Sequence, residues 1–403
     1  MTKFFKTALW SFITLLIIAI IVFSSYTFPL FKHFPKPTGP YAVGRVMYDV
    51  TDQNRLETYG TNPNQPRKIP ITIWYPTNIP TEKAPQYSAH LSAQMKAIKK
   101  RLKETTHIPL CVSDFFLRTQ NTYAISNAPL SDKQSSYPVI IFSPALGLFC
   151  DLYTVILEEL ASHGYIVVGV DHTYLSNITI FTDGSVAWMD DPSIRTPELC
   201  DGRATQDEMQ KEQMNINRSQ TYMADMQSAL AYISHLNNEH RSPFYHALDL
   251  NHIGIIGHSI GAKTGLEVCR IDDRCKVFID IDGWSGASLE GFNTPSLFMV
   301  GKLPDISQQD LKESGLTQKQ FDSFIQEHER KAQVLLSSHG AYLKLDNLNH
   351  RGFSDLMFLR WPWNVIADIG NVNPNQTLAL INETMIAFLS EIFNEKLNKK
   401  DVR

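Results

Sequence analysis

One pentapeptide constrains this chain more than any other stretch. Gly257-His258-Ser259-Ile260-Gly261 directly follows the apolar β-type run HIGII and directly precedes a segment of helical character. Glycines on both sides of a serine at a strand-to-helix junction allow a tight, strained turn that exposes the serine hydroxyl at the carboxyl edge of a sheet. We therefore expect Ser259 to be a nucleophile. The competing interpretation is a helix-capping serine between glycines that merely turn the chain.

The pattern around this motif indicates the fold class. From residue 137 onward, apolar β-branched runs alternate with longer helical stretches. The expected strands are 139–142, 166–170, 253–256, 277–281, 297–300 and 342–345, with a long helix near 218–236 and a final one near 376–396. Such alternation predicts an α/β protein with the α/β-hydrolase fold, in which a mostly parallel central sheet carries helices on both faces.

Length and composition set outer bounds. A chain of 403 residues suggests two or three domains, but the pattern favours one hydrolase domain over 34–403, enlarged by polar insertions, behind an N-terminal segment over 1–33. The 22 Phe, 15 Tyr and 6 Trp exclude a disordered chain. With 37 Lys+Arg against 41 Asp+Glu, the chain has no basic excess, which excludes nucleic acid as a partner.

The N-terminal segment has the pattern of a membrane-directed sequence. After Lys3 and Lys6 there is no charge until Lys32, and residues 8–23 are almost continuously apolar. With its uncharged continuation this run reaches the ~20 residues that a membrane span requires. A cleaved signal peptide and a retained transmembrane anchor both fit. In either case we expect an exported or membrane-anchored protein whose bulk lies on the outer, periplasmic or extracellular, side.

A serine nucleophile needs a base, and three histidines follow Ser259. In this fold the order along the chain is Ser, then Asp or Glu, then His. His328 belongs to a charged helical stretch and His339 precedes a strand, whereas His350 follows the strand expected at 342–345. We therefore expect His350 to be the base.

The acid and the oxyanion donors are less constrained by order alone. Asp282 follows the run VFIDI and Asp305 follows LFMV, so both remain candidates. Asp280 shares a face with Asp282 but lies farther from the carboxyl edge. The developing oxyanion requires two backbone N–H groups, one from Ile260 and one from the loop 143–147 after an early strand.

Several segments together resemble a known family. They occur in one order between residues 39 and 355: GPYAVG, ITIWYP, FSPALG, LASHGYIVVGVDH, GHSIGA, IDIDGW and NHRGFSDL. They resemble the plasma-type (group VII) platelet-activating-factor acetylhydrolases and their bacterial relatives. The resemblance implies Ser259 as nucleophile, Asp282 as acid and His350 as base, with Leu146 and Ile260 as oxyanion donors, and it favours Asp282 over Asp305.

The resemblance also implies an activity. The family consists of calcium-independent esterases of the phospholipase A2 type, which remove short or oxidised sn-2 acyl chains from phospholipids. No metal-ligand spacing, phosphate-binding glycine loop or dinucleotide fingerprint is present, so we expect no cofactor. Two alternatives remain: a general carboxylesterase or lipase without phospholipid preference, and a decayed, membrane-anchored scaffold that only binds.

Three further features concern the oxyanion loop, the end of one strand and the cysteines. Ala145 stands where the family usually has glycine, and an alanine would clash there if the position required a positive φ. The sequence VDH, which ends at His172, is favoured as a strand end supporting the rim of the site rather than as a site itself. Cys269 and Cys275 bracket a short turn and could form a disulfide or remain two packed thiols.

Overall fold

A computed structural model describes most of the chain. The described residues are 10–19, 30–60, 64–79, 91–106, 122–190, 208–283, 289–302, 317–319, 322–323, 325–326, 330, 340–361 and 363–398. The alternative acid Asp305 and the competing histidines His328 and His339 lie outside these residues.

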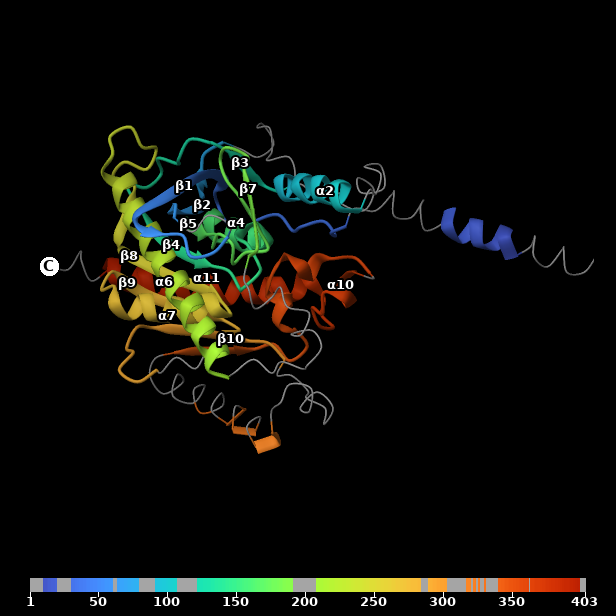
Figure 1. The fold of residues 1–403 in the computed structure, drawn as a ribbon. Helices are drawn as coiled ribbons and strands as arrows, with labels where there is room; N and C mark the ends of the chain where they lie inside the picture. The colour runs from blue at the N-terminus through green and yellow to red at the C-terminus, as the bar shows by residue number, and fades with distance from the viewer. Residues whose placement is uncertain are drawn as a thin grey trace, which may run out of the picture.

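A nine-stranded sheet forms the centre of the molecule (Figure 1). Its strands lie in the order β11 (Ala341–Lys344), β10 (Ser296–Val300), β9 (Cys275–Ile281), β8 (Leu248–His258), β4 (Tyr137–Ser143), β5 (Ile166–Val170), β2 (Pro66–Thr77), β1 (Ala42–Leu56) and β3 (Ala124–Ser126). Among these nine, only β2 runs antiparallel to its neighbours. The expected mostly parallel sheet is therefore confirmed.

Helices cover both faces of this sheet, as expected. In β4, Ile140 and Phe142 belong to a core cluster that contains residues of α4 (Thr154–Ser162) and α11 (Pro374–Asn398). Val139 and Ile141 belong to a second cluster with α6 (Glu208–Asn238) and α7 (Ile260–Ile271). Figure 1 shows α6 in front of the strands and α11 behind them. Because successive side chains of a strand point to opposite faces, an unbroken apolar strand such as β4 supplies both cores.

The remaining elements were not individually expected. They are the helix α2 (Ser92–Thr106), the hairpin β6 (Ile178–Ile180) and β7 (Val186–Trp188), and the short helix α10 (Trp363–Ile366). The question of the two cysteines is resolved, because Cys269 at the end of α7 and Cys275 at the start of β9 form a disulfide. Cys150 is free and buried.

The N-terminal segment is described only in part. Residues 10–19 form a helix, and no helix within the described ranges is long and apolar enough to cross a membrane. At residues 30–32 the chain joins the body of the protein. There the N–H of Lys32 donates to the carbonyl of Phe358, and the N–H of Arg360 donates to the carbonyl of Leu30.

Candidate active site

The pentapeptide forms a sharp turn between β8 and α7. Ser259 has φ 57° and ψ −122°, a backbone conformation that non-glycine residues rarely adopt. A Cβ on Gly257 would lie 2.3 Å from the backbone of Gly261, and a Cβ on Gly261 would lie 2.3 Å from the carbonyl oxygen of Ser143. Both glycines are therefore required by close backbone approach. This is the geometry of a nucleophile elbow, and Ser259 is its strained residue.

His350 and Asp282 are brought together at the same edge of the sheet. Asp282 directly follows β9, and His350 opens a 3₁₀ turn (His350–Phe353) after β11. The Nδ1 atom of His350 lies 2.6 Å from Oδ2 of Asp282, while Oδ1 of Asp282 accepts a hydrogen bond from the N–H of Gly301. The Asp282 side chain is 2% exposed and that of His350 is 44% exposed. The pair thus combines a buried carboxylate with a histidine that solvent or a substrate can reach.

His258 connects this pair to the elbow. Its ring lies 4.5 Å from the ring of His350, and its Nδ1 lies 2.6 Å from the hydroxyl of Tyr153. Burial, with the nearby His350 as a second cause, lowers the pKa of His258 well below its ordinary value, so the ring is neutral. Ser259 itself makes no side-chain hydrogen bond to the described residues, His350 included.

The distances among His258, Asp282 and His350 indicate a hydrogen-bonded Asp282–His350 pair with the neutral His258 beside it. Ligand atoms of His258, Asp282 and His350 all lie within 4.8 Å of one another. However, the 2.6 Å between His350 and Asp282 is a hydrogen-bond distance. Two ligands at ~2.0 Å from one tetrahedral zinc ion would lie roughly 3.3 Å apart. This arrangement therefore fits a proton-bridged pair better than a metal centre.

The loop after β4 makes its left-handed turn at Gly147. Gly147 has φ 80°, whereas Ala145 is not among the described residues with positive φ. The alanine is therefore accommodated without strain, because the left-handed position is two residues further on. The N–H groups of Leu146 and Ile260 have no acceptor among the described residues.

Sequence reasoning missed most of what surrounds this loop. His172 lies just beyond β5, is fully buried and is hydrogen-bonded to Ser143 at the end of the neighbouring strand β4. Asp225 on α6 and Tyr153 before α4 complete the surroundings. Ser143 belongs to the segment FSPALG and His172 to VDH, both noted in the sequence. Their contact arises because β4 and β5 are adjacent in the sheet, which the sequence does not indicate.

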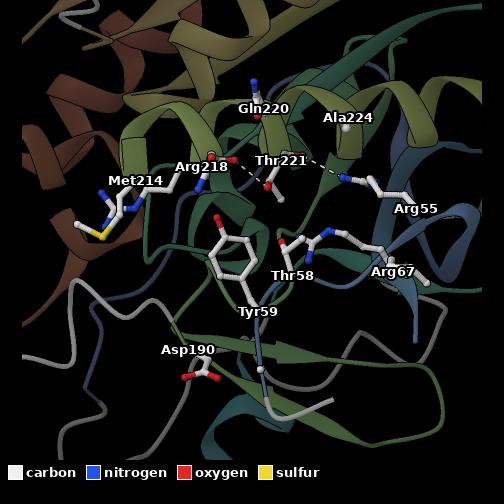
Figure 2. A pocket seen from close by; sticks show the side chains of 13 residues that line it. Arg55, Thr58, Tyr59, Arg67, Asp190, Met214, Arg218, Gln220, Thr221 and Ala224 are labelled. Carbon is white, nitrogen blue, oxygen red and sulfur yellow. Dashed lines mark hydrogen bonds between the residues drawn. The ribbon is translucent and has the colours of Figure 1, made fainter. Parts of the chain in front are cut away.

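A surface pocket lies away from these residues. It has a volume of about 730 Å³ and lies between the β1–β2 hairpin and the N-terminal half of α6 (Figure 2). Arg55, Tyr59, Arg67 and Thr221 are among its lining residues, but Ser259, Asp282 and His350 are not. The pocket therefore contains neither the serine elbow nor the hydrogen-bonded His350–Asp282 pair.

A strained serine elbow on a mostly parallel sheet, with a His–Asp pair at the same edge, defines the class of α/β-hydrolases. The match to a family model is more specific. The model described as "Platelet-activating factor acetylhydrolase, isoform II" matches residues 27–402, and the chain belongs to this family. The resemblance noted in the sequence is thereby confirmed.

Individual relatives carry related names. The chain is similar to "Platelet-activating factor acetylhydrolase" of Canis lupus familiaris, with 28% identity over 63% of this chain and 55% of that protein. It is also similar to the protein of the same name from Cavia porcellus, with 25% identity over 89% and 77%. A third relative is a "Probable 1-alkyl-2-acetylglycerophosphocholine esterase" of Arthroderma benhamiae, with 22% identity over 63% and 60%. The chain thus spans little more than half the length of the first of these relatives.

The fold also has a solved counterpart. A ferulic acid esterase from Streptomyces cinnamoneus superposes with a TM-score of 0.61 over 90% of this chain and 93% of its own. At 20% identity this likeness concerns the fold alone.

Proposed function

We propose that this protein is a serine esterase that hydrolyses carboxylic esters, with short or oxidised sn-2 acyl groups of phospholipids as its substrates. The observation that carries the proposal is the pairing of His350 with Asp282 at the strand edge that also bears Ser259 in the elbow. A buried carboxylate that accepts from Nδ1 leaves Nε2 of the histidine as the proton acceptor.

The mechanism follows from these positions. His350 Nε2 takes the proton from the hydroxyl of Ser259 as Oγ attacks the ester carbonyl. The N–H groups of Leu146 and Ile260 stabilise the resulting oxyanion. His350 then passes the proton to the leaving alkoxide, which leaves an acyl-enzyme on Ser259. Water, deprotonated by His350, releases the acid and regenerates the serine. The absence of a Ser–His hydrogen bond in the free protein agrees with this scheme, since such bonds often tighten only when substrate binds.

Exposed apolar side chains on and around α10 support a lipid substrate. Trp361, Trp363, Val365 and Ile366 on and around α10 are 79%, 40%, 66% and 67% exposed. We call these four residues the α10 patch; α10 lies at the right-hand side of Figure 1. Contiguous exposed apolar side chains are typical of surfaces that meet a membrane or a partner. Tryptophan in particular favours the membrane–water interface.

Backbone hydrogen bonds on either side of the α10 patch connect its flanking residues to the N-terminal segment and to the turn that carries His350. At one end, Arg360 is hydrogen-bonded to Leu30, where the apolar N-terminal run of the sequence ends. At the other end, the N–H of Asn349, next to His350, donates to the carbonyl of Ile369. These backbone hydrogen bonds connect the end of the apolar N-terminal run to the α10 patch, and the α10 patch to the segment that carries the proposed base. This sequence of contacts supports an exported enzyme that draws its substrate from a lipid surface.

Covalent labelling tests the chemistry. A fluorophosphonate probe should label the folded wild type, and Ser259→Ala should abolish both labelling and ester turnover. Ser162→Ala, which removes a hydroxyl at the end of α4, is the matched control and should label like wild type. Folded wild type that neither labels nor turns over esters would show that the chain is a binding scaffold.

A substrate panel tests the substrate class. p-Nitrophenyl esters of increasing chain length should be compared with short-chain sn-2 phosphatidylcholines, both in solution and in vesicles. A double variant, Trp361→Ala with Trp363→Ala, should lose vesicle binding and activity on vesicles while retaining turnover of soluble p-nitrophenyl acetate. Equal rates on all esters, with no effect of the two tryptophans, would favour a general carboxylesterase.

A further inference from the structure

A second Ser–His–Asp chain lies under the proposed oxyanion loop. The Oγ atom of Ser143 is 2.9 Å from Nε2 of His172, and Nδ1 of His172 is 3.0 Å from Oδ2 of Asp225. The three residues come from the end of β4, the segment after β5 and the middle of α6. Each of them is 0% exposed. The chain has the connectivity of a catalytic triad, but no substrate can reach its serine.

The proton positions in this chain follow from its charges. Burial alone would raise the pKa of the Asp225 carboxyl, but the charge and hydrogen bonds of Arg67 hold that pKa well below its ordinary range. Burial lowers the pKa of His172, so its ring is neutral. A carboxylate can only accept, which places the ring proton on Nδ1 and leaves Nε2 as an acceptor. Ser143 therefore donates its hydroxyl proton to His172, in one fixed direction.

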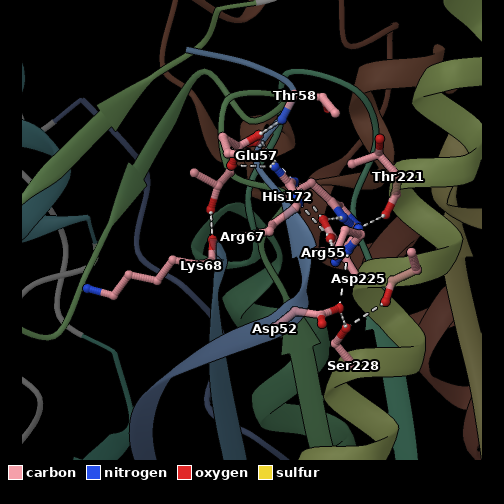
Figure 3. Close-up of polar contacts among 12 residues, drawn as sticks. Asp52, Arg55, Glu57, Thr58, Arg67, Lys68, His172, Thr221, Asp225 and Ser228 are labelled. Carbon is pink, nitrogen blue, oxygen red and sulfur yellow. Dashed lines mark hydrogen bonds and ion pairs between the residues drawn. The ribbon is translucent and has the colours of Figure 1, made fainter. Parts of the chain in front are cut away.

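Two arginines hold the acidic end of the chain in place. Arg67, itself 1% exposed, donates through Nε and Nη2 to both carboxylate oxygens of Asp225, and through Nη1 to Glu57. Arg55 also pairs with Asp225 and with Asp52 (Figure 3). These arginines line the pocket of Figure 2, yet their donors are directed to carboxylates and to the backbone carbonyls of Thr173 and Thr221. A charge-assisted network of this kind is rigid, because loss of any member leaves a buried charge unpaired.

The other end of the chain lies against the proposed catalytic machinery. The backbone of Ser143 and Pro144 approaches the elbow so closely that Gly261 admits no Cβ. The N–H of the next residue, Ala145, donates to the hydroxyl of Tyr153, which in turn contacts His258 of the elbow. Ser143 is the last residue of β4, three positions before Leu146, and its hydroxyl is hydrogen-bonded to His172 where the loop leaves the sheet.

We propose that Ser143, His172 and Asp225 are positioning residues that set the oxyanion donor of Leu146 against the elbow. The proposal rests on the proposed esterase function and adds to it a buried hydrogen-bond chain that does not touch the substrate. The carboxylate of Asp225, held by the arginines, orients the imidazole of His172. The imidazole orients the hydroxyl of Ser143, and this hydroxyl positions the loop that carries Leu146.

Ser143→Ala in the full chain tests this role with p-nitrophenyl acetate as substrate. Small displacements of a catalytic group reduce rates by about a hundredfold, and so does loss of one oxyanion donor. We therefore expect kcat to fall by about ten- to a hundredfold, with KM changed by less than about threefold. The inhibition constant of a trifluoromethyl ketone, whose tetrahedral adduct places an oxyanion between the same donors, should rise in the same proportion. Ser143→Cys, which keeps a weak donor, should recover part of both losses.

The control is another buried serine. Ser162 is 0% exposed, and its hydroxyl donates to the carbonyl of Glu159 and accepts from the N–H of Gly39. Ser162→Ala should lower the unfolding midpoint about as much as Ser143→Ala but leave kcat and the inhibition constant unchanged. If Ser143→Ala fails to fold, His172→Gln is measured in its place and the same losses are expected.

The outcomes separate the two proposals. Active wild type together with a folded Ser143→Ala whose kcat and inhibition constant match those of Ser162→Ala would overturn the positioning role and leave the esterase intact. Wild type that hydrolyses no ester and binds no ketone would overturn the esterase, and the positioning role with it.

Discussion

Nδ1 of His350 lies 2.6 Å from the Asp282 carboxylate, although 68 positions separate the two residues in the chain. The contact exists because β9, β10 and β11 are parallel neighbours, so the segments that follow β9 and β11 meet at one edge of the sheet. Asp282 adopts a positive φ of 48°, which turns the chain directly after β9. Asparagine and aspartate tolerate this conformation better than most residues.

This contact predicts a sharp difference between two aspartates. Asp282→Asn should reduce kcat on the order of 10³- to 10⁴-fold, because an amide no longer holds His350 in the tautomer that accepts at Nε2. Asp305→Asn is the matched control and should stay within about threefold of wild type. Steady-state kinetics with p-nitrophenyl acetate measure both. The reverse ranking would assign the acid to Asp305.

The loop after β4 predicts that substitutions at Gly147 and Ala145 differ in their effect on kcat. Gly147→Ala forces an L side chain into a φ of 80° and should lower the free energy of unfolding by about 1–2 kcal/mol. It should also reduce kcat, because Leu146 precedes it. Ala145→Gly should lower stability by about 0.5–1 kcal/mol through added chain entropy, with kcat within about threefold of wild type. Urea unfolding and initial rates measure both; a larger kcat in Ala145→Gly would show that the alanine impairs the loop.

A buried glutamate on α4 predicts a pH-dependent stability. Burial raises the pKa of Glu158 to about 8, although its carboxyl accepts hydrogen bonds from the N–H groups of Tyr123 and Ala124. Because the folded-state pKa lies above the unfolded value, the protonated group favours the fold below pH 4.5, and this contribution is lost as the pH rises towards 8.

Replacement by the neutral isostere should remove this dependence. Glu158→Gln should raise the free energy of unfolding by at least about 1 kcal/mol at pH 8 and change it little at pH 4.5. Chemical unfolding at both pH values measures the difference. A stability gain that is equal at the two pH values would contradict the assignment to Glu158.

The disulfide should affect stability but not catalysis. Cys269–Cys275 closes a short loop at the edge of the sheet where β9 begins, whereas Asp282 follows the opposite end of that strand. The Cys269→Ala, Cys275→Ala double variant should lose about 2 kcal/mol of stability and keep the kcat of wild type. Unfolding in the presence and absence of reductant provides the matched comparison, since reductant should shift only the wild type. A parallel loss of kcat would show that this turn communicates with the site.

Local features of the sequence determined the fold class and the position of the elbow. The strands expected at 139–142 and 277–281 lie within β4 and β9, and that at 166–170 coincides with β5. Apolar β-branched runs are reliable signals because a strand that is buried on both faces has no polar positions. The glycines of the elbow were informative for an equally local reason, since their requirement is a steric one within five residues.

Tertiary structure alone decided which distant groups meet. Order along the chain left Asp282 and Asp305 equivalent, and the meeting of strand ends brings Asp282 into contact with His350. The spacing of Cys269 and Cys275 allowed a disulfide or two thiols, and the turn between α7 and β9 brings them together as a disulfide. Nothing in the sequence near His172 indicates Asp225 or Ser143, because hydrogen bonds between a strand end and a helix depend on packing rather than on spacing. The sequence determines which chemistry is available, and packing determines which atoms come within hydrogen-bonding distance.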